Sequence, residues 1–163
     1  MPRQRVRPVA LSLAPMSLAL GRLSGAAEVL LAPHHSLAFS GNVIVVQVDR
    51  GGRDSLVSEG FGFASTASSS VGVELGYHGW WQAHDSLRGP FFGPSLLLGS
   101  TTQASVGDPA HAQTYWGIAF DVGAQEVLGG GFTFGGGAGL GIVKMGEAIA
   151  AFPRFLLQIG WSP

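Results

Sequence analysis

The clearest pattern in this chain lies between Phe132 and Val143, where two kinds of residue alternate. One alternate set is mostly apolar, and the other is almost entirely glycine. A period of two is that of a β-strand, and a helix is disfavoured because each interior glycine costs about 1 kcal/mol relative to alanine. A soluble sandwich would carry charge on its second face, and this face has none. The pattern predicts a strand of a narrow barrel whose apolar side faces lipid.

Seven further segments have the composition and length of strands. In residues 71–81, for example, large apolar residues alternate with a set that contains glycine, Glu74 and His78. The sequence therefore predicts eight strands, approximately at residues 6–13, 20–31, 36–46, 71–81, 91–100, 113–127, 132–143 and 151–161.

The connections between these segments alternate in length. The turns at 32–35 and 129–131 are tight, whereas 47–70 and 101–112 are long and polar. Outer-membrane barrels have short periplasmic turns and longer outer loops. Eight strands with both ends on the periplasmic side reproduce this alternation and predict antiparallel, up-and-down order.

Aromatic residues cluster at the predicted strand ends, as expected of side chains that lie at the two membrane interfaces. Tyr115 and Trp116 fall at the outer ends. The periplasmic ends carry Trp80, Trp81, Phe91, Phe92, Phe132 and Trp161.

Composition agrees with a membrane barrel. Hydrophobic residues make up 46% of the 163 residues and charged residues only 12%, against roughly 25% charge in soluble domains. No run of about 20 apolar residues is free of many glycines, as a membrane helix would require. Because only helices and closed barrels satisfy the backbone in lipid, the predicted fold class is all-β, an eight-stranded antiparallel up-and-down transmembrane β-barrel. We expect one domain over residues 1–163, located in the bacterial outer membrane with outer-membrane lipid as its surroundings.

The N-terminal region has two interpretations. Residues 1–8 are basic, 9–20 are mostly apolar, and Gly25-Ala26-Ala27 has the form of a cleavage site, as in a secretory signal. Pro15 and the alternation around Leu11 and Leu13 favour a strand instead. We prefer the strand, because removal of residues 1–27 would leave an odd number of strands, and we expect residues 1–8 to be disordered or a remnant of an export segment.

Several kinds of chemistry are disfavoured. A net charge of -1 argues against a nucleic-acid partner, and the absence of cysteine excludes disulfides, cysteine-based zinc sites and thiol catalysis. The five histidines show no H-x-x-x-H or H-E-x-x-H spacing, so no metal site is predicted. The glycine runs lack the strand-to-helix context of a phosphate loop, so no cofactor is predicted.

The polar residues on the predicted inner face are the candidate site. An eight-stranded barrel is filled by side chains, and unpaired charges inside it are costly, so we expect these groups to pair and plug the lumen. The expected network is structural rather than catalytic, and it consists of Arg22, Glu28, Glu74, His78, Asp121, Arg154 and Gln158.

Three functions are consistent with the sequence. The preferred one is a structural or surface-interaction role, in which loops 47–70 and 101–112 bind an extracellular ligand or protein. The second is a lipid-modifying enzyme, for which Ser105, Asp108 and His111 or His84-Asp85-Ser86 offer the residue types, but no G-x-S-x-G motif is present and no catalytic residue is predicted. The third is a soluble lipocalin-like barrel, which would line a cavity with its apolar face.

The chain also resembles a known family over roughly residues 9–162. It is similar to small eight-stranded outer-membrane barrels of the DUF3575 type, within the broader OmpA/OmpX-like class. The resemblance implies a barrel in the outer membrane and no established catalytic residue. It is carried by residues 21–28, 33–37, 74–77, 89–94, 119–123, 139–141 and 153–161.

Overall fold

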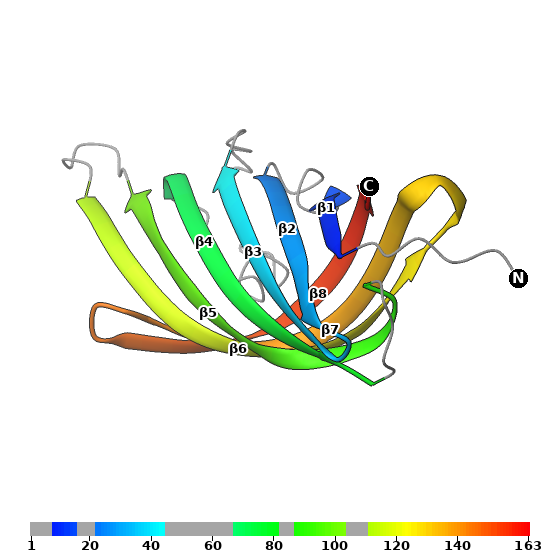
Figure 1. The fold of residues 1–163 in the computed structure, drawn as a ribbon. Helices are drawn as coiled ribbons and strands as arrows, with labels where there is room; N and C mark the ends of the chain where they lie inside the picture. The colour runs from blue at the N-terminus through cyan, green and yellow to red at the C-terminus, as the bar shows by residue number, and fades with distance from the viewer. Residues whose placement is uncertain (1–7, 16–21, 45–66, 82–86, 104–110) are drawn as a thin grey trace, which may run out of the picture.

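In the computed structural model, which describes residues 8–15, 22–44, 67–81, 87–103 and 111–163, the chain forms a closed barrel (Figure 1). Eight antiparallel strands follow one another in chain order, and β1 pairs with β8. The predicted all-β, eight-stranded up-and-down barrel is confirmed. The strands are β1 (Val9–Leu13), β2 (Arg22–Ala32), β3 (His35–Ile44), β4 (Ala67–Trp80), β5 (Gly89–Gln103), β6 (His111–Val127), β7 (Phe132–Met145) and β8 (Ala148–Trp161).

Several strands are longer than the sequence predicts. β4 begins at Ala67, β5 ends at Gln103 and β6 begins at His111, so the connections are shorter than the expected loops 47–70 and 101–112. The reason is that ladder hydrogen bonds join backbone groups and tolerate polar side chains. Ser70, for instance, pairs with Thr101, and both are buried. The rest of these two loops, at 45–66 and 104–110, lies outside the described residues.

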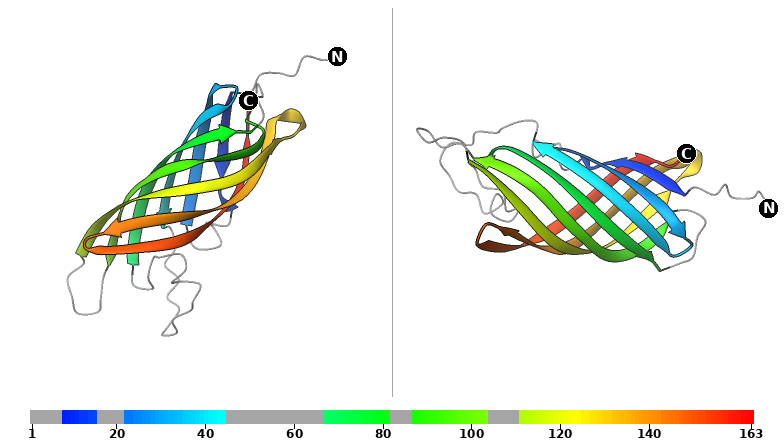
Figure 2. Two further views of the ribbon diagram at one scale, coloured as in Figure 1. Left: turned by 90° about the horizontal axis from the view of Figure 1, so that it is seen from below. Right: turned by 60° about the vertical axis from the view of Figure 1, so that its left-hand side comes forward.

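The first strand is formed by Val9–Leu13, and the segment 25–27 that has the form of a cleavage site lies within β2. Residues 1–7 lie outside the described part of the chain. The strands tilt steeply across the barrel, as two further views show (Figure 2).

The outer surface of the barrel is apolar. Thirty large hydrophobic side chains are exposed, whereas six hydrophobic residues are buried in the described part of the chain. In β6, Trp116, Ile118, Phe120 and Val122 are each more than half exposed, and Asp121 between two of them is 3% exposed. In β6 the two faces are therefore assigned as the alternation predicts, with large apolar residues outside and small or ionic residues inside, and β4, β7 and β8 follow the same rule along most of their length.

The inner face of the β6–β7 hairpin depends on glycine, because its neighbours leave no room for a Cβ atom. A Cβ on Gly123 would lie 2.6 Å from the carbonyl oxygen of Gly136, and one on Gly141 would lie 2.5 Å from the ring of Phe152. At Gly123 the limit is the close approach of the β7 backbone, and at Gly141 it is the ring of Phe152 from the neighbouring strand β8. Glycine also makes the tight turn before β7, where Gly130 and Gly131 have φ values of 82° and 95°.

An apolar plug lies inside the short-turn end of the barrel. It consists of Ala10, Trp80, Leu87 and Phe91, with the ring centroids of Trp80 and Phe91 5.4 Å apart. Trp80 and Phe91 were expected at the membrane interface, and this expectation was wrong. Consecutive strand residues point to opposite faces, so only one residue of each aromatic pair can face outward. The outward ones are Trp81 and Phe92.

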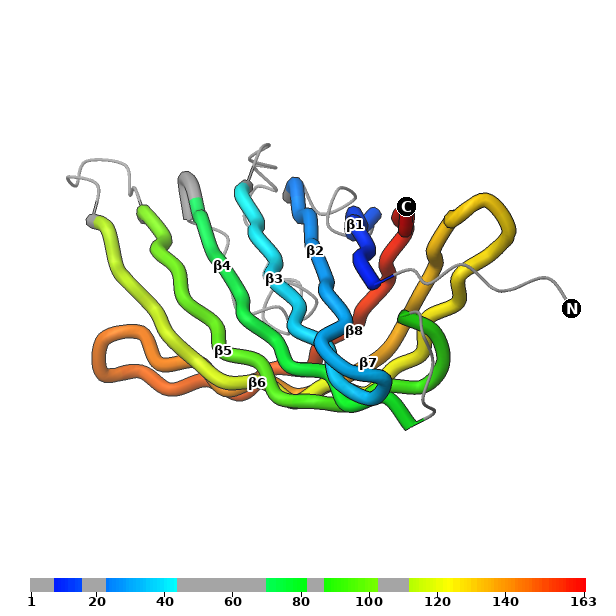
Figure 3. The backbone as a smooth tube through the Cα atoms, viewed as in Figure 1, coloured from blue at the N-terminus to red at the C-terminus, as the bar shows by residue number. Residues whose placement is uncertain are grey.

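The barrel closes through a short seam between β1 and β8. β1 has five residues, whereas β8 has fourteen, and the two strands pair at three positions, from Leu11–Trp161 to Leu13–Ile159. Figure 3 shows how short β1 is beside β2 and β8. The hydroxyl of Ser162 donates a 2.5 Å hydrogen bond to the carbonyl oxygen of Val9, which fastens this end of the seam.

Candidate functional site in the barrel lumen

The first polar cluster of the lumen is centred on Glu28 of β2. One of its carboxylate oxygens accepts a hydrogen bond of 2.5 Å from the Ser36 hydroxyl and lies 2.8 Å from Nδ1 of His78. Trp80 Nε1 donates to the Ser36 hydroxyl oxygen at 2.8 Å. Because Ser36 and His78 are register partners on β3 and β4, three adjacent strands contribute to one cluster. The cluster therefore favours one register of these strands over others.

On the side that faces the short-turn end of the barrel, this cluster is covered by other side chains. Ser36 is fully buried, and Glu28 and His78 are less than a tenth exposed. The His78 ring packs against Phe91, with 4.5 Å between the ring centroids. Trp80 and Phe91 contact this cluster and also belong to the apolar plug. Polar and apolar contacts therefore both close the short-turn end of the barrel.

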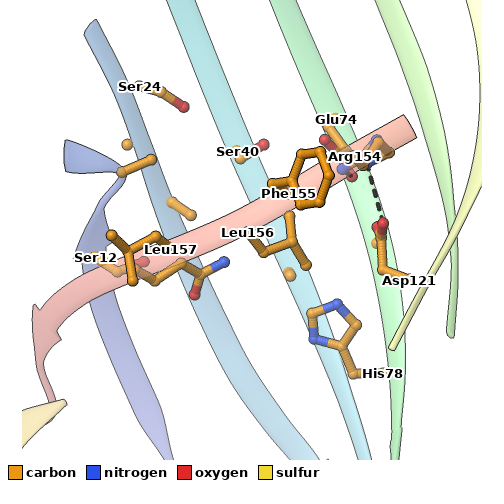
Figure 4. A pocket seen from close by; sticks show the side chains of 16 residues that line it. Ser12, Ser24, Ser40, Glu74, His78, Asp121, Arg154, Phe155, Leu156 and Leu157 are labelled. Carbon is orange, nitrogen blue, oxygen red and sulfur yellow. Dashed lines mark hydrogen bonds and ion pairs between the residues drawn. The ribbon is translucent and has the colours of Figure 1, made fainter. Parts of the chain in front are cut away.

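The second cluster joins three strands that are not neighbours. Arg154 of β8 donates from its NH2 group to Glu74 Oε1 of β4 at 2.7 Å, and its Nε atom lies 3.0 Å from Asp121 Oδ1 of β6. Figure 4 shows β8 crossing the view with the Arg154 side chain turned toward Glu74 and Asp121. The ion pairs therefore cross the lumen and connect walls that share no ladder.

The burial of these charges makes their pairing important. The Arg154 side chain is 11% exposed and the Asp121 side chain 4% exposed. A buried ion left without its partner costs several kcal/mol, whereas a paired one recovers most of that cost through Coulomb attraction and hydrogen bonds.

A cavity of about 170 Å³ lies beside both clusters. Glu74, Asp121 and Arg154 line it from the second cluster, and His78 lines it from the first. Gln158 of β8 and the hydroxyl-bearing Ser12, Ser24 and Ser40 complete its polar lining. The cavity is thus large enough for a few waters or a small polar group, and it offers hydrogen-bond donors and acceptors.

The structure brings together most of the residues that the sequence singles out. Glu28 and His78 form one cluster, and Glu74, Asp121 and Arg154 form the other, while Gln158 lines the cavity between β8 and the opposite wall. The backbone of Arg22 lies at the start of β2, opposite Ile44, but its side chain lies outside the described residues.

Sequence reasoning missed Ser36 and Trp80 as members of the first cluster. The alternation places Ser36 on the polar face of its strand without a partner and Trp80 on the inner face of its strand, but the clustering of aromatic residues at strand ends assigns Trp80 to the interface. The available signal was parity, which places Ser36 and His78 on the inner faces of their strands; their pairing is a β3–β4 register, which the short turn at 33–34 between β2 and β3 does not set.

No catalytic arrangement is formed by the described part of this cluster. The Ser36 hydroxyl donates to Glu28 rather than to His78, so the nucleophile–base contact of a serine hydrolase is not made. Ser105, Asp108 and the His84–Ser86 run lie outside the described residues, as does the side chain of His111. Among the residues that the structure describes, no group of three histidine, aspartate or glutamate side chains is placed to hold a metal ion.

Comparisons with known proteins add no further constraint. No protein-family model, curated protein or solved structure matches the chain. Within the described ranges, no helix has the length and apolar character needed to cross a bilayer.

Proposed function

We propose that this protein is a transmembrane β-barrel of the bacterial outer membrane with a structural or surface-interaction role. The observation that carries the proposal is the distribution of apolar side chains: thirty large hydrophobic residues lie exposed around the described part of the barrel and ionic groups lie inside. Monomeric soluble proteins rarely expose contiguous apolar patches of more than a few hundred Å². Hydrocarbon is the solvent in which such a surface is favourable.

The height of the apolar surface also fits a bilayer. In β6, the outward residues from Trp116 to Val122 are all apolar, and Ala124 continues the series. This stretch of nine residues matches the 9–11 residues of a tilted transmembrane strand. Exposed tryptophans lie toward the two ends of the barrel, with Trp116 as the first residue of this stretch and Trp161 at the end of β8, and amphipathic rings are enriched at both interfaces of membrane barrels.

The same distribution favours the membrane barrel over a soluble lipocalin-like barrel. A soluble barrel that binds an apolar ligand would turn its apolar face inward and leave polar residues outside. Here Phe120 and Leu140 are exposed, while Glu28 and Asp121 are buried. Within the described residues no specific contact favours the lipid-modifying enzyme, so we do not propose it.

The two polar clusters and the apolar plug occupy the lumen. Any binding of a partner is therefore expected at the outer surface of the protein. We propose that residues between β3 and β4 and between β5 and β6 present this surface to an extracellular ligand or protein. This assigns no ion-conducting role to the barrel, because an eight-stranded lumen is filled by its side chains.

The first experiment tests membrane insertion. The protein, refolded into phosphatidylcholine vesicles, should co-float with the vesicles and migrate faster on a gel without boiling than after boiling. A monodisperse monomer that stays soluble without detergent would overturn the proposal.

A matched pair of variants tests the orientation of the wall. Val122→Arg places a charge on the outer surface near mid-barrel and should destabilise the folded state in vesicles by about 2–4 kcal/mol, whereas Leu128→Arg, at the short-turn end, should cost about 0–1 kcal/mol. Both side chains are half exposed, so a soluble barrel would tolerate both changes equally. The measurement is urea unfolding in vesicles, and equal effects would contradict a lipid-facing surface.

A further inference from the structure

Two histidine rings lie side by side at the short turn between β2 and β3. His34 belongs to the turn, and His35 is the first residue of β3. Successive residues of a strand point to opposite faces, but the turn interrupts this alternation. The two ring centroids are 6.4 Å apart, the ring planes meet at 64°, and both residues are exposed. The pair has none of the spacings of helical metal motifs, because a turn forms it.

Both rings direct their Nδ1 atoms toward β4. His34 Nδ1 lies 3.0 Å from the carbonyl oxygen of Trp80, and a carbonyl only accepts, so this nitrogen carries the proton. His35 Nδ1 forms a hydrogen bond with the Tyr77 hydroxyl, and the two rings stack with 5.8 Å between their centroids. In neutral His34 the lone pair is therefore on Nε2. A phenol accepts as well as donates, so Tyr77 is compatible with the same tautomer in His35.

This arrangement is typical of histidines that bind metal ions. A ligating imidazole usually engages its other ring nitrogen with a backbone carbonyl, a carboxylate or water, which sets the tautomer and raises the basicity of the ligating nitrogen. The Trp80 carbonyl is in this position for His34, and the phenol is in it for His35. The Trp80 amide also donates to the His34 carbonyl oxygen at 2.8 Å, so the backbone holds the turn against the end of β4.

We propose that His34 and His35 bind one divalent transition-metal ion through their Nε2 atoms, with the rings oriented by the Trp80 carbonyl and the Tyr77 hydroxyl. Neutral imidazole suits Cu²⁺, Ni²⁺ and Zn²⁺, and the general order of affinity places Cu²⁺ first. A metal–nitrogen distance of about 2.0–2.1 Å requires the two rings to approach each other by roughly 1 Å, a movement that exposed rings allow. Within the described ranges no third histidine or carboxylate completes the site, so water fills the other coordination positions and the ion is exchangeable.

A titration with Cu²⁺ alone tests the site in the full chain, refolded in detergent micelles. Bound Cu²⁺ quenches nearby tryptophan fluorescence, and Trp81 is 76% exposed and follows the residue whose carbonyl holds His34. Saturable quenching is expected, together with an electron paramagnetic resonance spectrum that shows coupling to two nitrogen atoms. Mg²⁺ takes oxygen ligands and should cause no change at the same concentration.

Four variants separate an oriented site from two unrelated surface imidazoles. His34→Gln and His35→Gln should each weaken Cu²⁺ binding at least about tenfold, because each removes one of two ligands. Tyr77→Phe keeps the aromatic ring and removes only the hydroxyl, and it should weaken binding about tenfold. His111→Gln is the matched control, because it removes an imidazole at the start of β6, at the opposite end of the barrel, and should leave the affinity unchanged. Heat-modifiable migration verifies that each variant folds.

The outcomes distinguish this site from the membrane location, on which it does not depend. Unchanged affinity in His34→Gln or His35→Gln, or coupling to a single nitrogen atom, would overturn the metal site. Unchanged affinity in Tyr77→Phe would overturn the orientation of the rings that the proposal includes. Two-nitrogen Cu²⁺ binding by a barrel that does not co-float with vesicles would support the metal site and contradict the membrane location alone.

Discussion

The two polar clusters in the lumen use similar chemistry for different purposes. The Glu28 cluster joins the adjacent strands β2, β3 and β4 and is sealed by Trp80 and Phe91. The Arg154 cluster joins β8 to β4 and β6 across the lumen and borders the cavity. The first fixes how neighbours are aligned, and the second fixes how far apart opposite walls lie.

Their difference in composition has an energetic consequence. The partners of Glu28 are a hydroxyl and an imidazole from adjacent strands, so this cluster contains a single carboxylate and no guanidinium. Arg154 cannot become neutral, and it has two carboxylate partners in a mostly buried site. We therefore expect the cluster that crosses the lumen to be the more sensitive to single substitutions.

The largest effect is expected for Arg154→Ala. This variant leaves Glu74 and Asp121 facing each other without a cation and should lower the free energy of unfolding in vesicles by about 3–5 kcal/mol. Urea titration followed by tryptophan fluorescence measures the loss.

A triple variant separates charge from shape at the same site. Arg154→Met combined with Glu74→Gln and Asp121→Asn removes all three charges while keeping similar volumes, and most of the lost stability should return. A triple variant as unstable as Arg154→Ala would contradict the view that the unpaired carboxylates cause the loss.

A smaller effect is expected for Glu28→Ala. The substitution removes the acceptor of the Ser36 hydroxyl and the partner of His78, and it should destabilise the barrel by about 1–3 kcal/mol. Glu28→Gln keeps an acceptor oxygen and should lose less than Glu28→Ala in the same urea titration. A loss at Glu28 equal to that at Arg154 would remove the distinction between the two clusters.

The smallest effect is expected between the clusters, at Gly76 of β4. A Cβ atom there would lie 3.6 Å from Ser95 Cβ and 3.7 Å from His78 Nε2, which are ordinary contacts, so Gly76→Ala should change stability by about 0.5 kcal/mol or less. Gly123→Ala is the matched control, because its Cβ would lie 2.6 Å from the Gly136 carbonyl oxygen and should cost about 1–3 kcal/mol. Equal losses of stability in the two variants would show that the space available for a Cβ atom does not determine which inner glycines can be replaced.

Much of the fold follows from the period-two alternation. Because one face of each strand is apolar and the other small or ionic, strand position and facing could be predicted for β4, β6, β7 and β8 to within a few residues. The same parity assigns Glu74, Asp121 and Arg154 to the inner face, where all three side chains lie. Parity predicts whether a residue faces the lumen or the outside, and this is the property of the site residues that could be predicted from the sequence.

Parity does not fix the height of a residue along the barrel, so the sequence alone does not determine which inner residues pair. Arg154 and Glu74 are 80 residues apart, and their contact depends on the tilt and register of all strands between them. The position of Leu87, fully buried in the plug with its carbonyl bonded to Gln125, has no periodic signal because it lies next to a connection rather than within a strand.

The hydrogen bond from Ser162 to Val9 joins residues 153 positions apart, and it belongs to the seam between the first and last strands. Every other strand pair joins segments that follow one another in the chain, so those hairpins can form locally while this seam requires nearly the whole barrel. Until it forms, β1 and β8 are both open edges with unsatisfied backbone groups. We therefore expect the seam to be the last part of the barrel to form, and to be the point at which an unfinished barrel is most exposed to pairing with another chain.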